Sequence, residues 1–416
     1  MVTLKLISFG VLSSILAWQP MAAQERPPAV ASPSTTGLLL ARVAHHRGTD
    51  AMDDTSMVRY ETLWIVRDVS GAHIAAKLPD IVVPRKAGFW RLGIEHTCQV
   101  NPPAADDPKD FSSVATEDYG YAVPVEQTPT VETQFAACDP LTAKRLLDDS
   151  YDQAGSVEAE QSRDPKALPG CGYRTLWFES VLPDFLSVAM FQGDSELCDL
   201  RGGNIYKEFW VQNPDEAIPQ MGPGGQQIPF DFLFGDAGHR AWIHAVSGGN
   251  PEGDSCIADD PTEDISQTGW YLRHVKGAWR TSAFVQVGRV CVAYGDPKVA
   301  VPRSMTHGAP LGVPWGDLEK QLPGIWDAYL SPDGSVLVAI RGKQAPVTYE
   351  YQVDTITLFD FSNKKIGEKL LDIPGSKIVM AEWATGRYVQ AWSETLTSLQ
   401  SRGLPSPIQK VQQAPK

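Results

Sequence analysis

Strand-length apolar runs alternate with short polar turns along most of the chain, most clearly over residues 324–392. In the first half of this segment, two apolar runs flank a Pro332-Asp333-Gly334 turn. In its second half, residues 354–362 and 366–373 flank a polar Asn-Lys-Lys turn. Tight turns between runs rich in β-branched residues are typical of β-hairpins. The segment therefore predicts a unit of four antiparallel strands.

A second copy of this pattern is found near the N-terminus. Residues 68–81 and 360–373 align without a gap at an offset of 292 residues, and Asp, Ser, Ile, Lys, Leu, Asp and Ile coincide. The alternative is coincidence between β-rich segments of similar composition. A four-stranded unit repeated along a chain predicts a β-propeller.

The Ser331-Pro-Asp-Gly334 turn and the Leu358-Phe-Asp-Phe361 strand resemble repeats of the WD40, TolB and YncE-like propeller superfamily. The resemblance implies an all-β propeller of four-stranded antiparallel blades, about seven in number, with long loop insertions. It implies nothing specific about function, because propellers serve as scaffolds, ligand binders and enzymes. Two packed β-sandwiches are the alternative architecture.

The propeller domain is expected over residues 37–400, and residues 38–44 are expected to complete a blade formed by C-terminal strands. Further strands are expected at 62–94, 176–190, 204–212, 230–244 and 284–294. Residues 270–280 are expected to form two strands joined by a Lys276-Gly277 turn. The one helical segment is expected at 140–149. Acidic or Gly- and Pro-rich loops are expected at 101–134, 150–169, 213–229 and 247–268.

The N-terminus has the pattern of a secretory signal peptide. Lys5 precedes an apolar run over residues 6–18, and small residues follow up to Ala23. We therefore expect a signal peptide at 1–23, a disordered leader at 24–36 and a flexible tail at 401–416. The mature protein is expected to be exported, to the periplasm or the cell exterior, without an integral membrane segment.

Six cysteines in an exported chain predict disulfides. The simplest pairing is sequential, although six cysteines allow 15 pairings and a metal site is the alternative. The expected pairs are Cys98–Cys138, Cys171–Cys198 and Cys256–Cys291.

The chain carries 50 acidic against 36 basic residues, a net charge of −14. This balance disfavours nucleic acid and anionic membrane surfaces as partners. We expect a monomer that binds a protein, a small molecule or a glycan. No cofactor is expected; calcium is the alternative, because Asp106-Asp107, Asp148-Asp149 and residues 259–264 form acidic clusters.

Catalytic motifs are absent from the sequence. There is no Gly-x-Ser-x-Gly elbow, phosphate-binding loop or His-Glu-x-x-His helix. Ser362 and Lys365 match Ser-x-x-Lys, but a hairpin turn is expected between them, whereas acyl transfer needs both on one helical face. No catalytic residue is therefore predicted.

Histidines and turn-flanking tryptophans are the candidates for a ligand surface. His239 and His244 are expected on one strand, where side chains five residues apart point to opposite faces. The complete candidate set is His239, His244, Trp270, Arg273, His274 and Trp279. The predicted function is a binding or interaction module. The alternative is a hydrolase or lyase with its site at the mouth of a central channel.

Overall fold

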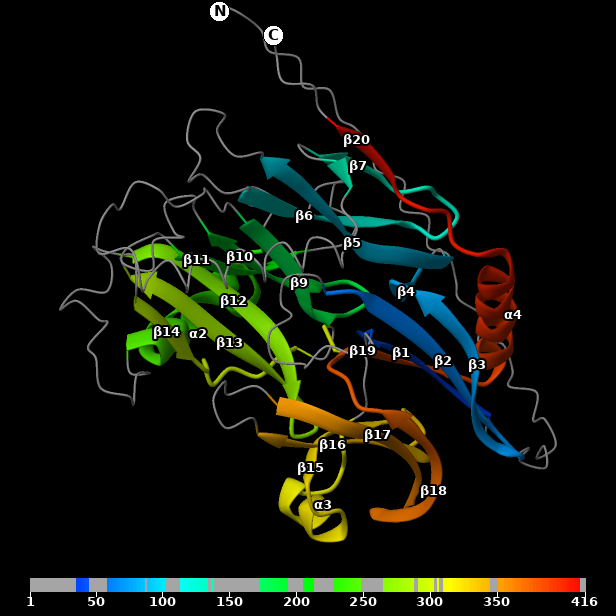
Figure 1. The fold of residues 1–416 in the computed structure, drawn as a ribbon. Coiled ribbons are helices and arrows are strands. Elements are labelled where there is room, and N and C mark those ends of the chain that lie inside the picture. The colour runs from blue at the N-terminus through cyan, green and yellow to red at the C-terminus, as the bar shows by residue number, and fades with distance from the viewer. Residues whose placement is uncertain are drawn as a thin grey trace, which may run out of the picture.

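Most of the chain is β-structure in the computed structural model, which describes residues 35–44, 58–86, 88–101, 113–133, 136–137, 173–193, 205–212, 228–247, 265–287, 291–302, 305–306, 310–344 and 351–411. Within these ranges the strands form several antiparallel sheets (Figure 1). The all-β class expected from the turn pattern is confirmed. No closed ring of blades is evident among the described residues.

The N-terminal sheet contains, in spatial order, β19 (Ile378–Thr385), β1 (Thr36–Val43), β2 (Tyr60–Asp68) and β3 (Gly71–Pro79). The large sheet contains β11 (Ile205–Gln212), β10 (Leu186–Gly193), β9 (Tyr173–Val181), β6 (Ser113–Pro124), β5 (Gly88–Asn101) and β4 (Ile81–Arg85), with β8 (Ala136–Ala137) beside β5. The β12–β14 sheet contains β12 (Ile265–Val275), β13 (Ala278–Val287) and β14 (Cys291–Gly295). The β15–β18 sheet contains β15 (Ile325–Leu330), β16 (Val336–Gln344), β17 (Tyr351–Ser362) and β18 (Lys365–Pro374). A separate parallel pair contains β20 (Ile408–Val411) and β7 (Thr130–Thr133).

The N-terminal sheet joins the two ends of the described chain. β1 pairs with β2 on one side and with β19 on the other, so the expected pairing of residues near 38–44 with C-terminal strands is confirmed. Both faces of β1 are buried. Leu38 and Leu40 pack against the β15–β18 sheet, whereas Leu39 and Ala41 pack against the large sheet. A strand buried on both faces needs an unbroken apolar run, which β1 has.

The two matching sequence segments form hairpins at equivalent places in two sheets. Each runs from the end of the third strand into the fourth strand of a four-stranded antiparallel sheet, from β2 into β3 in one and from β17 into β18 in the other. The turns lie at 69–70 and 363–364. Equivalent positions in the two hairpins are therefore shifted by two residues relative to the gap-free sequence match. The turn between Ser362 and Lys365 is also confirmed.

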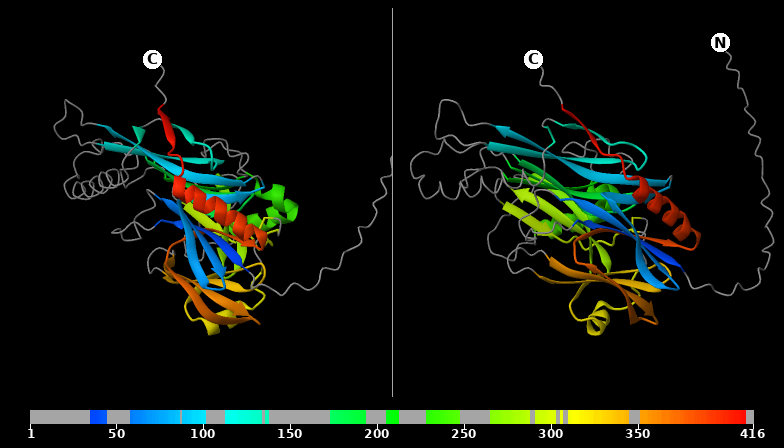
Figure 2. Two further views of the ribbon diagram at one scale, coloured as in Figure 1. Left: turned by 90° about the vertical axis from the view of Figure 1, so that its right-hand side faces the viewer. Right: turned by 45° about the vertical axis from the view of Figure 1, so that its right-hand side comes forward.

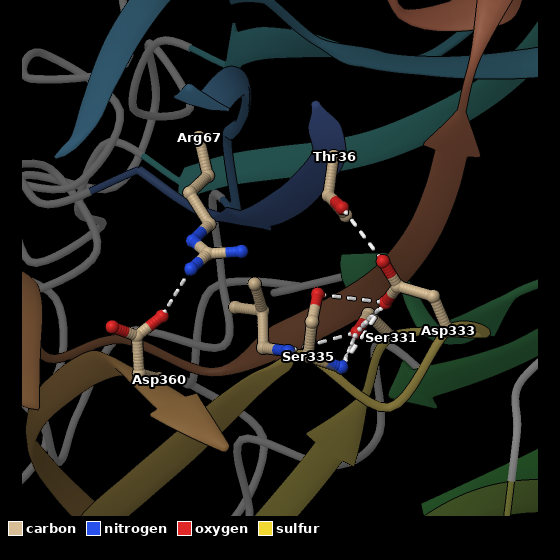
Figure 3. A network of polar contacts seen from close by, with 7 residues as sticks. Thr36, Arg67, Ser331, Asp333, Ser335 and Asp360 are labelled. Atoms are coloured by element: carbon tan, nitrogen blue, oxygen red, sulfur yellow. Dashed lines mark hydrogen bonds and ion pairs between the residues drawn. The ribbon is translucent and has the colours of Figure 1, made fainter. Parts of the chain in front are cut away.

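Polar contacts hold these two sheets together at one end of their strands (Figure 3). Arg67 Nη2 lies 2.5 Å from Asp360 Oδ1, and Thr36 Oγ1 donates a hydrogen bond to Asp333 Oδ2 over 3.2 Å. Asp333 also accepts hydrogen bonds from Ser331 and Ser335 within its own turn. The Pro332-Asp333-Gly334 turn, predicted from the sequence, is thus both a hairpin turn and an inter-sheet contact.

Two longer helices, α2 (Phe230–Ser247) and α4 (Arg387–Arg402), and the short α3 (Trp315–Gln321) accompany the sheets. The strand expected at 230–244 is wrong, because this segment is α2 with a kink at Gly235. Phe230 and Phe234, four residues apart, lie on one face of α2 and pack edge-on against Trp270. None of the helices in the described part of the chain is long and apolar enough to cross a membrane.

Up to Val411 the chain follows a defined path over the strands, although a flexible tail was expected from residue 401. α4 lies beside β2 and β3 in both views (Figures 1 and 2), and its Trp392 packs against Trp64. After the helix, Arg91 of β5 donates a hydrogen bond to the carbonyl of Pro405. β20 then pairs in parallel with β7. Residues 403–411 are therefore attached to the large sheet.

Candidate functional site

Three of the six candidate residues meet on the β12–β13 hairpin. Arg273 and His274 lie near the end of β12, and Trp279 lies near the start of β13. The Lys276-Gly277 turn joins the strands, as the sequence predicted. Both turn residues have positive φ, 52° for Lys276 and 72° for Gly277, which is the type I′ geometry that matches the twist of a hairpin.

His274 is enclosed by three neighbouring side chains. Its imidazole stacks on Tyr329 of β15 with ring centroids 4.0 Å apart, and meets the edge of Trp279 at 5.1 Å. Its Nδ1 lies 2.8 Å from Asp327 Oδ2, and the two side chains are only 8% and 4% exposed. Because the carboxylate accepts, Nδ1 carries the proton in the neutral ring. Nε2 is then left with the lone pair.

Asp327 connects the hairpin turn to the β15–β18 sheet. Its second oxygen, Oδ1, accepts hydrogen bonds from the backbone N–H of Gly277 over 2.7 Å and of Ala328 over 2.9 Å. Asp327 follows a bulge at Trp326, where β15 has one residue more than β16. Bulges turn side chains away from the regular alternation of a strand. One buried carboxylate thereby fixes both the imidazole and the turn.

Tyr329 completes the buried side of the site. Burial raises the pKa of its hydroxyl well above 10, and the neighbouring Asp327 carboxylate raises it further. Tyr329 is therefore a neutral phenol at physiological pH. The side of the hairpin that faces β15 is therefore lined by the rings of His274, Trp279 and Tyr329, with the Asp327 carboxylate bound to His274.

The opposite face of the same hairpin is cationic. Arg273 and Arg280 are directly opposed across β12 and β13. Arg273 Nη2 contacts both oxygens of Asp296 at 2.8 Å, and Asp296 Oδ1 also accepts a hydrogen bond from buried Ser282 over 2.9 Å. Arg280 is exposed and has no ion pair with any described residue.

The other three candidates do not join this site. Trp270, expected at the surface, is 4% exposed and packs with Phe230 and Phe234, so that expectation is wrong. It faces the core because it lies two residues from buried Leu272, on the same face of β12. His239 and His244 are exposed on α2, and the strand geometry used to compare them does not apply.

The predicted disulfides and calcium clusters fall mainly outside the described residues. Cys98 and Cys291 lie in β5 and β14, while Cys138, Cys171, Cys198 and Cys256 lie outside the described ranges. The acidic clusters at 106–107, 148–149 and 259–264 also lie outside them. Among described residues, no group of three or more His, Cys, Asp and Glu is placed to hold a metal ion.

Sequence reasoning missed Asp327, Tyr329 and Asp296. Asp327 and Tyr329 are in the segment predicted as a blade, and Asp327 interrupts the apolar run Ile-Trp-Asp-Ala-Tyr-Leu. A carboxylate within a buried strand needs a partner, which is the signal that could have identified it.

No family model matches the chain, and no curated protein matches it.

Proposed function

We propose that this protein is a binding module whose ligand surface is the tip of the β12–β13 hairpin, including Lys276, Trp279 and Arg280. The observation that carries the proposal is that the carboxylate of Asp327 binds both the turn and the adjacent His274. Asp327 fixes His274 and the Gly277 N–H from an adjacent sheet, so an exposed tip is held rigid from below. Rigid presentation lowers the entropy cost of binding.

The residues at the tip are of the kinds that dominate recognition. Trp and Arg are enriched among residues that contribute most to binding energy. Lys276 and Arg280 are exposed, and Trp279 is half-buried against His274.

The test compares two matched turns. Lys276→Asn removes the tip charge and keeps a type I′ turn, because Asn-Gly is a preferred pair there. Lys364→Gly makes the corresponding change in the β17–β18 turn, where Asn363 and Lys364 also have positive φ. A panel of sugars, nucleotides, amino acids and short peptides is screened by thermal shift. At least one compound should stabilise the parent and the Lys364→Gly variant but not Lys276→Asn. The proposal fails if every response survives Lys276→Asn.

The second candidate function is a hydrolase or lyase, and the His274–Asp327 pair is the specific observation in its favour. A carboxylate that orients an imidazole through Nδ1 prepares Nε2 as a general base. Activity on a panel of nitrophenyl esters and glycosides, lost in His274→Gln but retained in Lys276→Asn, would favour the enzyme. Equal background rates in the parent and His274→Gln would remove it.

As an architecture, we propose a propeller-like arrangement with fewer blades than the expected seven. The blade-like units would be the N-terminal sheet, the β4–β6 and β9–β11 parts of the large sheet, the β12–β14 sheet and the β15–β18 sheet. Support comes from the first strands of several of these groups, since β19 contacts β9, β9 contacts β12, and β12 contacts β15.

We also propose that the protein is exported, that its cysteines pair in disulfides and that it is a monomer. Peptide mass mapping with and without reductant tests the pairing.

A further inference from the structure

The Arg273–Arg280 pair is an unfavourable feature of the hairpin that calls for a physical reason. Residues directly opposite on an antiparallel pair have side chains on one face, and like charges there are destabilising. Among the described residues, Asp296 is the one acidic residue that forms an ion pair with either arginine. It contacts Arg273, so the charge of Arg280 remains uncompensated.

The wider sheet repeats this imbalance. The described residues at 265–287 and 291–302 include the basic residues Arg273, Lys276, Arg280 and Lys298, but Asp296 is their one acidic residue. The chain as a whole has a net charge of −14. Positive charge is thus concentrated on one hairpin and its neighbouring strand in an otherwise acidic protein. A local potential of this sign attracts anions.

We propose that Arg273 and Arg280 bind an oxyanion group of the ligand, namely a carboxylate, sulfate or phosphate. The inference rests on the proposed binding function and names its ligand class. The planar guanidinium presents several N–H donors that match the oxygens of such groups. Asp296 holds Arg273 in place, and Ser282 in turn holds Asp296. Arg280 supplies the free charge, and the bound anion relieves the repulsion between the two arginines.

The experiment measures the unfolding temperature in sodium sulfate, phosphate or succinate against sodium chloride at equal ionic strength. The parent should gain several degrees in at least one of the three anions, and which anion acts distinguishes the three groups. Arg280→Gln should lose that gain. Lys365→Gln, which removes one exposed charge from another hairpin, should keep it.

A second readout separates the site from a general effect on folding. In chloride alone, Arg280→Gln should unfold at the same temperature as the parent or higher, because the repulsion with Arg273 is removed. A gain that persists in Arg280→Gln, or no gain in the parent, overturns the anion site. If neutral compounds still bind in a Lys276-dependent manner, the binding function stands without it. If no compound and no anion binds, both proposals fail.

Discussion

His96 and Asp118 face each other across β5 and β6, with Nδ1 and Oδ1 2.6 Å apart and both side chains buried. The other carboxylate oxygen accepts a hydrogen bond from the backbone N–H of Leu176 in β9 over 2.9 Å. β6 and β9 pair in parallel over two residue pairs, Thr116 with Tyr173 and Glu117 with Arg174. The carboxylate of Asp118 therefore strengthens a junction where backbone pairing is short.

We predict that the His96–Asp118 pair makes the protein less stable as the pH rises above neutral. Burial disfavours the imidazolium, but the charge and hydrogen bond of Asp118 outweigh burial and raise the pKa of His96. A raised pKa in the folded state gives stability that is complete below about pH 6.5 and is lost as the pH rises through the folded value. Urea unfolding from pH 5 to 9 should show this loss in the parent and a flatter curve in His96→Asn. Identical slopes would contradict it.

Asp118→Ala tests the same junction by removing the carboxylate of the His96–Asp118 pair. It removes the partner of His96 and the acceptor of the Leu176 N–H, and both are buried. Breaking a buried charge pair costs about 3–5 kcal/mol. The free energy of unfolding should fall by about 3 kcal/mol, whereas Asp118→Asn, which keeps an oxygen acceptor, should lose less. Equal losses in the two variants would show that the Leu176 contact adds nothing.

Glu382 of β19 should produce a second pH dependence of stability, which begins at a lower pH than that of His96. Burial, with a smaller repulsion from Asp184, raises the pKa of its carboxyl to about 8. The unfolded chain releases this proton near pH 4.5, so stability falls as the pH rises from there to about 8. The loss is on the order of 5 kcal/mol, at about 1.4 kcal/mol per pKa unit. Glu382→Gln should remove the slope between pH 5 and 6.5, where His96→Asn leaves it unchanged. A parent curve that is flat over this interval would contradict the prediction.

The hairpins were predictable from the sequence because turn chemistry is local. Pro332-Asp333-Gly334 and Lys276-Gly277 form turns where expected, and Gly334 and Gly277 have the positive φ that such turns require. The pairing of β1 with β19 could also be inferred, since an apolar strand at each end needs a partner. These features depend on neighbouring residues or on the composition of a whole strand.

The helices were missed although their spacing was visible. Val389, Leu396 and Leu399 follow a helical period in α4, but this segment was assigned to the propeller domain without a helix. In α2, aromatic residues at 230 and 234 were interpreted as a strand. The candidate site was found only in part for a different reason. His274 and Asp327 are separated by 53 residues, and no local pattern connects them.

Asp333→Ala should destabilise the contact between the N-terminal and β15–β18 sheets. Partial burial raises the pKa of the Asp333 carboxyl, but hydrogen bonds from Ser331, Ser335 and Thr36 outweigh it and lower the pKa overall. Its stabilising effect is therefore present at neutral pH and lost as the pH falls through the folded pKa. We expect a loss of about 1–2 kcal/mol at pH 7, less than for a fully buried carboxylate. The difference from the parent should shrink below pH 4. Asp317→Ala, on the exposed side of α3, is the control and should have little effect.

Gly37→Ala tests how closely the first strand approaches the core. A Cβ at this position would lie 2.0 Å from Trp64 Cη2, and the indole cannot move away. Trp64 is fully buried, packs against Trp392 at 5.6 Å and donates a hydrogen bond from Nε1 to Ser393 Oγ over 2.9 Å. Forcing a methyl group into a packed core costs about 1–3 kcal/mol, and we expect a loss in that range by urea unfolding.

The control for this substitution is Gly316→Ala in α3, where a Cβ would meet no atom within 4 Å. Alanine in a helix is favoured over glycine by about 0.5–1 kcal/mol, so this variant should be slightly more stable than the parent. The two changes add the same methyl group and should act in opposite directions. Adding Trp64→Leu to Gly37→Ala should cost less than the sum of the two single losses, because the smaller side chain makes room for the methyl group. Additive losses would mean that the indole does not set the requirement for glycine at position 37.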